Sequence, residues 1–500
     1  MDHNQIISHF LQLNRTRIAR LSKLVTSSQQ RFFNLLPFLI HTNIPGLPGY
    51  INKDVPVGII DYQADEKTIK DAEKLNPALR YRHHAIRHYA VAGLYLINPY
   101  GLLNIPKQLS FTLYLVYTDL TETQRQVLEK KLTLLRRWAK DCDIDLNITF
   151  FAQHDLKTTS LSPEQREQLY LNGLNLGGAI PLWCLVPPNE DYQTIAASLS
   201  QQRLSTSRLL LDFGPSNVES PQTLLEDTTA LLNEGLEYGL TQILSLLYKQ
   251  SQITHYPNQI ILSDEVKKAI YEGENEPLAL DCKVLQLRHI ERINDNPTNT
   301  RLARQSLYIQ TQEALSKHTS LPQFPWRRDY IKQLSNNWSW SSYEFQVLDR
   351  RESAKYPQCQ DEHLQTHAIF ANTSTVLHQF AKQEQLTIQS QHKQIDKKLQ
   401  NYQDPPPNII SRLPKGLVAK TPEDEIHLYH FNAEDDWKLS LIALSAPKQR
   451  PLYQSPSLLH LLAWAVHNGL LTKSTRILIA DKTHSITINT LISLVQQLCR

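Results

Sequence analysis

Glycine is scarce in this sequence: there are 14 glycines among 500 residues, well below the usual ~7%. Because glycine lets the backbone approach phosphates closely, this scarcity argues against an elaborate glycine-rich nucleotide loop. Cysteine is also rare. The five cysteines are widely spread and never form a C-x-x-C pair: Cys142, Cys184, Cys282, Cys359 and Cys499. They support neither a disulfide framework nor a cysteine-rich zinc site, and they favour a reducing compartment.

Long hydrophobic runs are missing as well. No segment approaches the roughly 18–20 apolar residues that a membrane helix requires. The opening M-D-H-N-Q-I-I-S-H-F lacks the basic region and apolar core of a secretory signal. The net charge of +3 is nearly neutral for this length, so the whole chain carries no electrostatic footprint for nucleic acid. We therefore expect a cytoplasmic protein with neither a membrane nor a nucleic acid as partner.

The residues that are present describe a globular chain. A hydrophobic fraction of 41% and a charged fraction of 20% are typical of packed domains, and the length suggests two to four of them. The clearest pattern lies within Val91–Phe151. It predicts a turn, a strand at Gln108–Tyr117, an amphipathic helix at Thr123–Lys140 and a second strand at Ile144–Phe151. These elements form the core of a small α/β unit.

The rest of the chain divides around this unit. Helices are expected at Gln5–Leu24, Gln29–Ile40 (kinked or ended by Pro37), Glu66–Leu79, Gln165–Leu176, Thr223–Lys249, Thr300–Ser316, Ser457–His467 and Asn489–Cys499. A short strand or extended segment is expected at Val55–Tyr62, and strands are expected at Ala179–Pro187, Ile426–Phe431, Leu439–Leu444 and Thr475–Ile479. The pattern predicts a mixed α+β protein in which the small α/β core precedes a large helical region and a small C-terminal α/β module.

The predicted domains follow from these patterns. Residues 1–85 form an N-terminal helical region and loop, 86–190 the α/β core, and 191–400 a mainly helical domain. The segment N-Y-Q-D-P-P-P-N, residues 401–408, is the clearest linker signal, and 409–500 form the C-terminal module.

Two basic stretches are weak candidates for phosphate binding. The run R-Y-R-H-H-A-I-R-H includes Arg82 and His84, and Arg327 with Arg328 follows a tryptophan. A solvated helix or turn face explains the first stretch more simply, because adjacent His83 and His84 point different ways on a helix and make a poor ligand pair. A salt-bridged helix start explains the second stretch more simply.

Short segments spread through the chain point to one family. They are Phe33–Pro37, Pro45–Tyr50, Val55–Ile59, Leu182–Pro187, Tyr256–Asn258, Trp326–Arg328, Trp338–Trp340, Leu462–Ala465 and Asn468–Thr472. Each match is short, but together they occur in the same order across nearly the whole chain. In these segments the sequence resembles the bacterial class I adenylate cyclases.

The resemblance implies a nucleotidyltransferase-like fold of the DNA polymerase β type that converts ATP to cyclic AMP with magnesium. Such sites use a Gly-Ser turn for the triphosphate and an Asp-x-Asp on the following strand for two metal ions. Hard divalent cations need oxygen ligands, and the metals must activate a hydroxyl and neutralise the departing pyrophosphate. Asp at i and i+2 of a strand places both carboxylates on one face.

This chain departs from that pattern at the positions that matter most. Aligning Gly93 with the family places Asn98-Pro99 at the Gly-Ser turn, and the same register places Ser110 and Thr112 at the Asp-x-Asp. Proline removes a backbone donor from the turn. The neutral hydroxyls of Ser110 and Thr112 cannot supply the negative charge that holds magnesium.

No other acidic residues are expected to replace the missing metal ligands. A third acidic position falls near His154, with Asp155 one residue further on. Two further acidic groups are present: Asp141, Asp143 and Asp145 before the second strand, and Asp119 with Glu122 after the first. The former is typical of a helix-to-strand turn and the latter of a helix start, so neither is expected to bind metal.

No nucleophile stands in an activating context either. Cys184 lies in an apolar stretch that we interpret as a buried strand. Four tryptophans are most simply packing residues: Trp183, Trp326, Trp338 and Trp340.

Three hypotheses follow. In the preferred one, the chain is a degenerate member of the resembled family that binds a protein partner, or weakly a nucleotide, and makes no cyclic AMP. It would need no cofactor and have no catalytic or metal residues. In the second, it is a working cyclase with a rearranged metal site, and only then are Mg²⁺ and ATP expected. In the third, the old cleft hosts different chemistry, for which the sequence shows no constellation.

Overall fold

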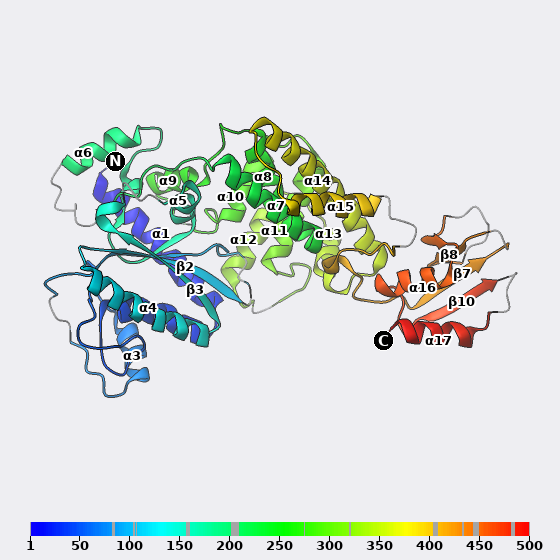
Figure 1. Ribbon diagram of the computed structural model, residues 1–500, viewed down its shortest axis with the longest axis horizontal. Coiled ribbons are helices and arrows are strands. Elements are labelled where there is room, and N and C mark those ends of the chain that lie inside the picture. Colours follow the sequence, from blue (N-terminus) through cyan, green and yellow to red (C-terminus); the bar gives the residue numbers. More distant parts are fainter. Residues whose placement is uncertain are drawn as a thin grey trace. The chain divides into compact units, whose positions relative to one another are not determined.

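The computed structural model describes residues 2–82, 86–103, 106, 108–156, 161–201, 210–274, 276–319, 322–403, 409–432, 435–443, 450–481 and 486–499. The chain divides into two compact units: Met1–Ser220 with Pro257–Arg288, and Pro221–Tyr256 with His289–Arg500. Both units combine helices and strands (Figure 1), so the predicted mixed α+β class is confirmed. The five-part domain division stays a prediction.

A four-stranded sheet in the order β3-β2-β1-β4 organises the first unit. Its strands are β1 (Val91–Ile97), β2 (Leu109–Tyr117), β3 (Ile144–Ala152) and β4 (Gly173–Gly178). β1 pairs antiparallel with both β2 and β4, whereas β2 and β3 are parallel and are joined by α4 (Glu122–Asp141). The predicted strand–helix–strand is confirmed, but the segment before it, expected as a turn, begins with the buried strand β1.

Helices cover both faces of this sheet. The other elements of the unit are α1 (His3–Leu24), α2 (Ser27–His41), α3 (Glu66–Leu75), α5 (Pro163–Asn172), α6 (Tyr192–Gln201), α9 (Leu262–Glu272), β5 (Ile180–Pro181) and β6 (Leu210–Leu211); α10 (Cys282–Ile293) starts here. Figure 1 shows α3 and α4 on one side of the sheet and α1, α5 and α9 on the other. On the α2/α4 side, the ring of Phe111 packs edge-on against Phe33, with centroids 5.1 Å apart. The alternation of β2 thus supplies one apolar face and one more polar face.

Local sequence signals failed at several places in this unit. The helix expected to reach Leu176 ends at Asn172, because Gly173–Gly178 pairs with β1 as β4. A β-carbon at Gly173 would lie 2.2 Å from the carbonyl oxygen of Leu169, so this tight exit from the helix requires glycine. The expected strand at Ala179–Pro187 is only the two-residue β5 followed by a 3-10 turn.

Three further predictions are confirmed only in part. The helix predicted at Gln29–Ile40 is α2, and Pro37 lies inside it without ending it, since α2 continues to His41 within a buried run. Cys184 lies in a 3-10 turn, not a strand, although it is buried as expected. Val55–Tyr62 forms no strand and contributes only an isolated bridge between Ile59 and Val91.

The segment Pro257–Arg288 returns to the first unit after the chain has left it at Ser220. Glu167 of α5 accepts hydrogen bonds from the backbone N–H (2.9 Å) and the hydroxyl (2.5 Å) of Ser263. His9 Nδ1 of α1 lies 2.9 Å from the Ile270 carbonyl oxygen. Helix α9 therefore closes the layer that α1 and α5 begin.

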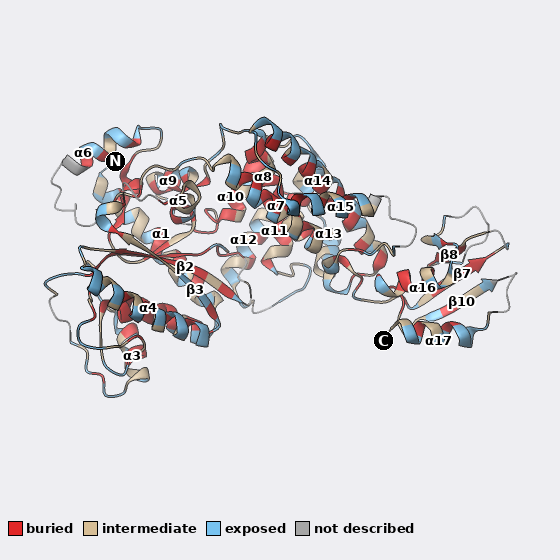
Figure 2. Ribbon diagram, in the orientation of Figure 1, coloured by how far each residue is buried: buried red, intermediate tan, exposed pale blue. Residues whose placement is uncertain are grey.

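The second unit starts with helices. They are α7 (Pro221–Tyr238), α8 (Ile243–Thr254), α11 (Pro297–Thr311), α12 (Pro325–Asn336), α13 (Ser342–Asp349), α14 (Tyr356–Gln383) and α15 (Ser390–Gln403). The single helix expected at Thr223–Lys249 is broken between α7 and α8 by a 3-10 turn at Gly239–Gln242, where Gly239 has φ +64°. Figure 2 shows buried residues along the facing sides of α7, α8 and α14.

The last part of this unit is a second small sheet in the order β10-β7-β8-β9. Its strands are β7 (Glu425–His430), β8 (Trp437–Ser440), β9 (Tyr453–Ser455) and β10 (Arg476–Asp481), and the helices α16 (Leu458–His467) and α17 (Ile488–Leu498) belong to the same part of the chain. The strand expected at Leu439–Leu444 starts earlier and ends at Ser440, and β9 was not expected. The rings of Tyr453 and Trp464 stack at 4.1 Å in its core. Among the described helices of the chain, none is long and apolar enough to cross a membrane.

Candidate functional site

The two residues at the predicted metal-binding positions lie together near the start of β2. Ser110 and Thr112 are both partly buried and share the polar face of the strand. The parallel register places Ser110 beside Asp145 and Thr112 beside Asn147 on β3. The Ser110 hydroxyl donates to Asp145 Oδ2 at 3.4 Å. This patch therefore contains one carboxylate, one amide and two hydroxyls.

The turn after β1 uses its polar groups internally. Asn98 is 3% exposed, and its side-chain amide donates to the Gly101 carbonyl (2.7 Å) and accepts from the Tyr100 backbone N–H (3.2 Å). The next donor, the Leu102 N–H, is 2.5 Å from Asp281 Oδ2. Gly101 has φ +68°, and a β-carbon there would lie 2.3 Å from the same oxygen. These donors are thus not presented to a phosphate.

The pocket beside this turn is small. It is lined by residues that include Arg17, Asn98, Gly101 and Asp281, and its volume is ≈ 20 Å³. That is room for about one water molecule, whereas ligand sites usually measure about 300–1,000 Å³. A nucleotide triphosphate does not fit here in this conformation.

Arg17 and Asp281 are two buried residues of opposite charge behind the turn. The Arg17 guanidinium donates to the carbonyl oxygens of Leu171 (3.1 Å) and Leu280 (3.2 Å). Burial lowers the pKa of Arg17 to about 10, although the nearby Asp281 carboxylate opposes this shift. Burial likewise raises the pKa of Asp281, against the hydrogen bonds from backbone N–H groups. Through their hydrogen bonds to backbone groups, the two side chains hold α1 and the turn in place rather than facing solvent.

His154 does not join Ser110 and Thr112. It follows β3 in a short 3-10 turn, is exposed, and lies near the carboxylates of Asp119 (3.7 Å) and Asp155 (3.4 Å). Because β2 and β3 are parallel, His154 lies beyond the carboxyl end of the pair and Ser110 at its start. At about 3.3 Å per residue, the register from Asp145 to Ala152 separates the two ends by about 23 Å.

Asp145 is the acidic residue that sequence reasoning set aside. Its neighbour Asp143 is a turn residue as expected, with φ +57° and an N–H that donates to Lys140. Asp145, however, is already inside β3 and faces Ser110. The predicted strand–helix–strand connection indicates that β2 and β3 can lie side by side, but the register that pairs Asp145 with Ser110 is visible only in the structure.

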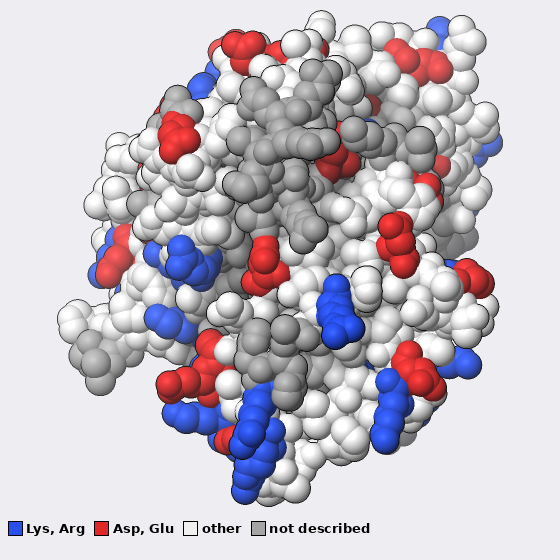
Figure 3. All heavy atoms as spheres, turned by 90° about the vertical axis from the view of Figure 1, so that its left-hand side faces the viewer, with Lys and Arg blue, Asp and Glu red and all other residues white. Residues whose placement is uncertain are grey.

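The basic candidates are placed as follows. Arg82 is exposed, and His84 lies outside the described residues. Figure 3 shows Lys and Arg interspersed with Asp and Glu on the face it presents, without a single basic patch. Arg327 Nε donates to Glu313 (2.8 Å), and Arg328 donates to the carbonyls of two residues of the preceding loop. The latter pair thus belongs to a salt-bridged helix start.

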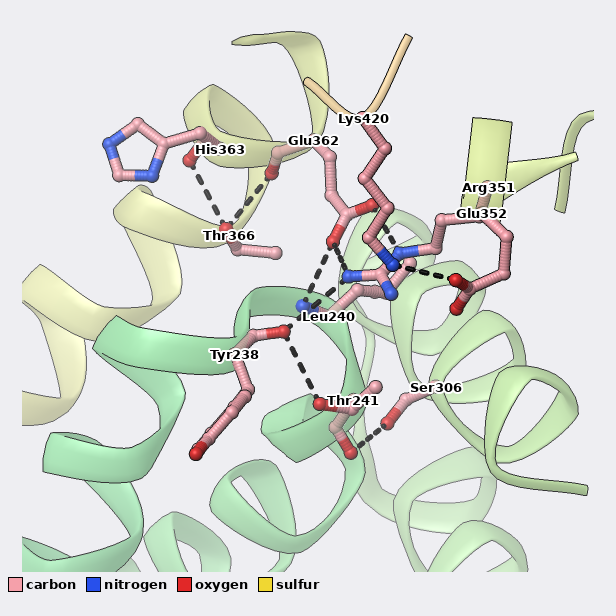
Figure 4. Close-up of polar contacts among 10 residues, drawn as sticks. All are labelled: Tyr238, Leu240, Thr241, Ser306, Arg351, Glu352, Glu362, His363, Thr366 and Lys420. Carbon is pink, nitrogen blue, oxygen red and sulfur yellow. Dashed lines mark hydrogen bonds and ion pairs between the residues drawn. The ribbon is translucent and has the colours of Figure 1, made fainter. Parts of the chain in front are cut away.

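The second unit contains a pocket of ≈ 260 Å³ whose lining includes Leu240, Arg351, Glu362 and Lys420. Figure 4 shows how its charges are used. Arg351 donates to both carboxylate oxygens of Glu362 at 2.8 Å, and Glu362 also accepts from the Leu240 N–H at 3.2 Å. Lys420 donates to Glu352 at 2.7 Å. These contacts tie α14 to the break between α7 and α8.

A larger pocket of ≈ 640 Å³ lies beside α14 and α15 in the same unit. Its lining includes His363, His367, Tyr402 and basic side chains such as Lys398 and Arg412. Both ring nitrogens of His363 and Nε2 of His367 are buried without a hydrogen-bond partner. Burial, with a smaller contribution from His367, lowers the pKa of His363 to about 4. The volume lies in the range of small-ligand sites.

The sequence matches three related family models in order. Residues 2–183 match the adenylate cyclase N-terminal domain, 232–413 the second domain of class I adenylate cyclase, and 433–500 its third domain. The sheet with Ser110 lies in the first match, and both larger pockets are lined mainly from the second.

Curated relatives agree with these models. Adenylate cyclases of Salmonella typhimurium and of Escherichia coli K12 are each 24% identical over 501 residues, and that of Yersinia intermedia is 24% identical over 499. Each match covers 93% of this chain but 58% of the relative, so the chain spans little more than half of their length. No solved structure matches the chain.

Proposed function

The chain belongs to the class I adenylate cyclase family, and from that premise we propose that it forms no cyclic AMP and acts by binding. We further propose that the β3-β2-β1-β4 sheet is a nucleotidyltransferase-like core. A mixed sheet with a β–α–β connection and two alternate polar positions on one strand supports this assignment. The observation that carries the proposal is the chemistry of those two positions.

Two-metal catalysis needs several carboxylates around one point, because only concentrated negative charge holds two divalent cations 3.5–4 Å apart. Here Ser110 and Thr112 contribute hydroxyls, and Asp145 contributes the one carboxylate facing them in the described sheet. In the turn that would cradle the phosphates, the Tyr100 N–H donates to Asn98 and the Leu102 N–H donates to Asp281. Both halves of the expected reaction site are therefore unsuited to Mg²⁺-ATP.

A direct activity assay tests this proposal. Purified protein incubated with Mg²⁺-ATP or Mn²⁺-ATP is expected to form no more cyclic AMP than a heat-denatured control, because the metal ligands are missing. A full-length relative such as the Escherichia coli enzyme serves as the positive control. Turnover comparable to that enzyme would overturn the proposal and favour a rearranged metal site.

Restoring carboxylates tests the placement of the site. The double variant Ser110→Asp/Thr112→Asp puts two charges beside Asp145, so it is expected to melt at a lower temperature than wild type without metal. Added Mn²⁺ is expected to bind this variant and recover the lost melting temperature. Adding Asp145→Asn to the double variant should weaken Mn²⁺ binding again. Equal Mn²⁺ affinity with and without Asp145 would show that the three positions do not form one site.

Calorimetric titration with ATP addresses what the protein binds. The lining of the ≈ 640 Å³ pocket includes three cations (Lys398, Arg412 and Lys415) and one carboxylate (Glu237). If the cations bind the phosphates there, the affinity should not depend on Mg²⁺. We expect Arg412→Ala to weaken such binding and Ser110→Ala to leave it unchanged. ATP binding that requires Mg²⁺ and is lost in Ser110→Ala would return the binding function to the sheet.

A further inference from the structure

Three potential metal ligands meet where α14 packs against α15. His378 Nε2 lies 2.8 Å from Asp396 Oδ2, and His392 Nε2 lies 3.8 Å from Asp396 Oδ1. One ligand atom from each of the three residues lies within 4.8 Å of the others. His392 and Asp396 are one turn apart on α15 and so share a face of that helix, while His378 comes from α14.

The hydrogen bonds around His392 determine which ring nitrogen faces this cluster. Thr229 Oγ1 donates its single proton to the Leu225 carbonyl at 2.7 Å. It can therefore only accept from His392 Nδ1, which lies 3.4 Å away. With the proton on Nδ1, the neutral ring directs the lone pair of Nε2 toward Asp396. Histidine ligands of metals are usually fixed by a hydrogen bond of this kind on the other nitrogen.

The cluster contains more hydrogen-bond acceptors than protons to satisfy them. Ser374 Oγ donates its one proton to Asp396 Oδ1 at 2.5 Å, yet the lone pair of His392 Nε2 also faces this hydroxyl at 3.3 Å. Two acceptors thus compete for one proton. A cation between His392 and Asp396 would satisfy both acceptors.

We propose that His378, His392 and Asp396 bind a divalent transition-metal ion of the Zn²⁺ type. Two imidazole nitrogens and a carboxylate are the ligand types that zinc prefers, whereas Mg²⁺ and Ca²⁺ favour oxygen alone. Zn–N bonds of about 2.0–2.1 Å put tetrahedral ligand atoms about 3.3 Å apart. The two histidines lie 2.8 and 3.8 Å from the two oxygens of the Asp396 carboxylate, and one ligand atom of each residue lies within 4.8 Å of the others, so small side-chain movements bring them to that spacing.

The surroundings allow the ion to enter and the ligands to adjust. The His378 side chain is 43% exposed, whereas His392 is 2% exposed and held from α7 by Thr229. The buried histidine is a fixed anchor, and the exposed one can rotate onto the ion. Because His378 is exposed, water can reach the ion and complete its coordination. The bound metal ion cross-links α14 and α15.

Calorimetry with ZnCl₂ on the EDTA-treated full chain tests this inference. Wild type is expected to bind one ion saturably, with affinity reduced at least tenfold in His378→Ala and in Asp396→Asn. The matched control is His427→Ala, which removes a histidine 3.1 Å from a single carboxylate, Glu425. That control should bind as wild type does. His378→Ala is safe for folding because the side chain is exposed.

Two further readouts keep the result unambiguous. The absorption spectrum of the Co²⁺-loaded protein should show nitrogen and oxygen ligands without a thiolate charge-transfer band. Zn²⁺ should raise the melting temperature of wild type, and EDTA should reverse this, while neither changes His378→Ala. The inference is overturned by the absence of saturable binding, by unchanged affinity in His378→Ala, or by a thiolate band that assigns the ion to a cysteine. None of these outcomes bears on cyclic AMP formation.

Discussion

Replacing Asp281 by alanine is expected to lower the free energy of unfolding of the first unit by about 3–5 kcal/mol. The carboxylate is 4% exposed and accepts from the backbone N–H groups of Leu102 (2.5 Å) and Lys283 (2.9 Å). Alanine leaves both donors unpaired and leaves the buried Arg17 guanidinium without its nearby negative charge. Urea unfolding followed by tryptophan fluorescence measures the change.

Two variants separate charge from hydrogen bonding at this site. Asp281→Asn retains one acceptor oxygen, so its loss should be smaller than that of alanine but still larger than 1 kcal/mol or so. Asp119→Ala removes a carboxylate whose side chain is 98% exposed, and it should change stability by less than about 0.5 kcal/mol. If Asp281→Ala unfolds with the same midpoint as Asp119→Ala, the turn after β1 is not held by this carboxylate.

Lys131→Met is expected to make the stability of the first unit depend less on pH. Lys131 is 1% exposed on α4 and donates to the Thr42 carbonyl at 2.5 Å. Burial lowers its pKa to about 7 from 10.5. Between these values the unfolded chain binds a proton that the folded chain does not, so the stability of wild type rises with pH over this window. The full interval corresponds to about 5 kcal/mol at about 1.4 kcal/mol per pH unit.

The methionine variant has no such group, so it should be more stable than wild type at pH 7 and lose that advantage as the pH approaches 10. Unfolding midpoints of the two proteins at pH 7, 8, 9 and 10 give the difference, in which other titrating groups cancel. The same replacement at Lys130, a neighbouring position on α4 that is not buried, should leave the pH profile unchanged. A constant difference between wild type and Lys131→Met would contradict the expected neutral lysine.

Elements with a local signal could be predicted from the sequence. Helix α4 carries its period of apolar residues and begins with the Thr121–Gln124 capping box, and β2 and β3 alternate or run apolar. β4 carries no such signal. Its sequence G-L-N-L-G-G is a strand only because β1 lies beside it, pairing Gly93 with Gly178.

The candidate sites, too, could be predicted from the sequence only where the signal is local. The replacement of acidic residues by Ser110 and Thr112 was visible in the sequence, since it depends on residue type alone. The contact of Ser110 with Asp145 depends on strand register, and the approach of His378 to His392 depends on how two helices pack. Spacing along the chain records neither. His392 and Asp396 stand one helical turn apart, which is a weak signal without the partner from α14.

The return of Pro257–Arg288 to the first unit has a consequence for synthesis on the ribosome. Helix α9 and Asp281 complete the packing of α1 and α5 and of the turn after β1, yet they are translated after the chain has begun the second unit. From Ser220 to Arg288 translation takes roughly 3–14 s at about 5–20 residues per second. During that time the apolar faces of α1 and α5 lack their cover, so the nascent chain passes through a stage in which chaperones can bind it.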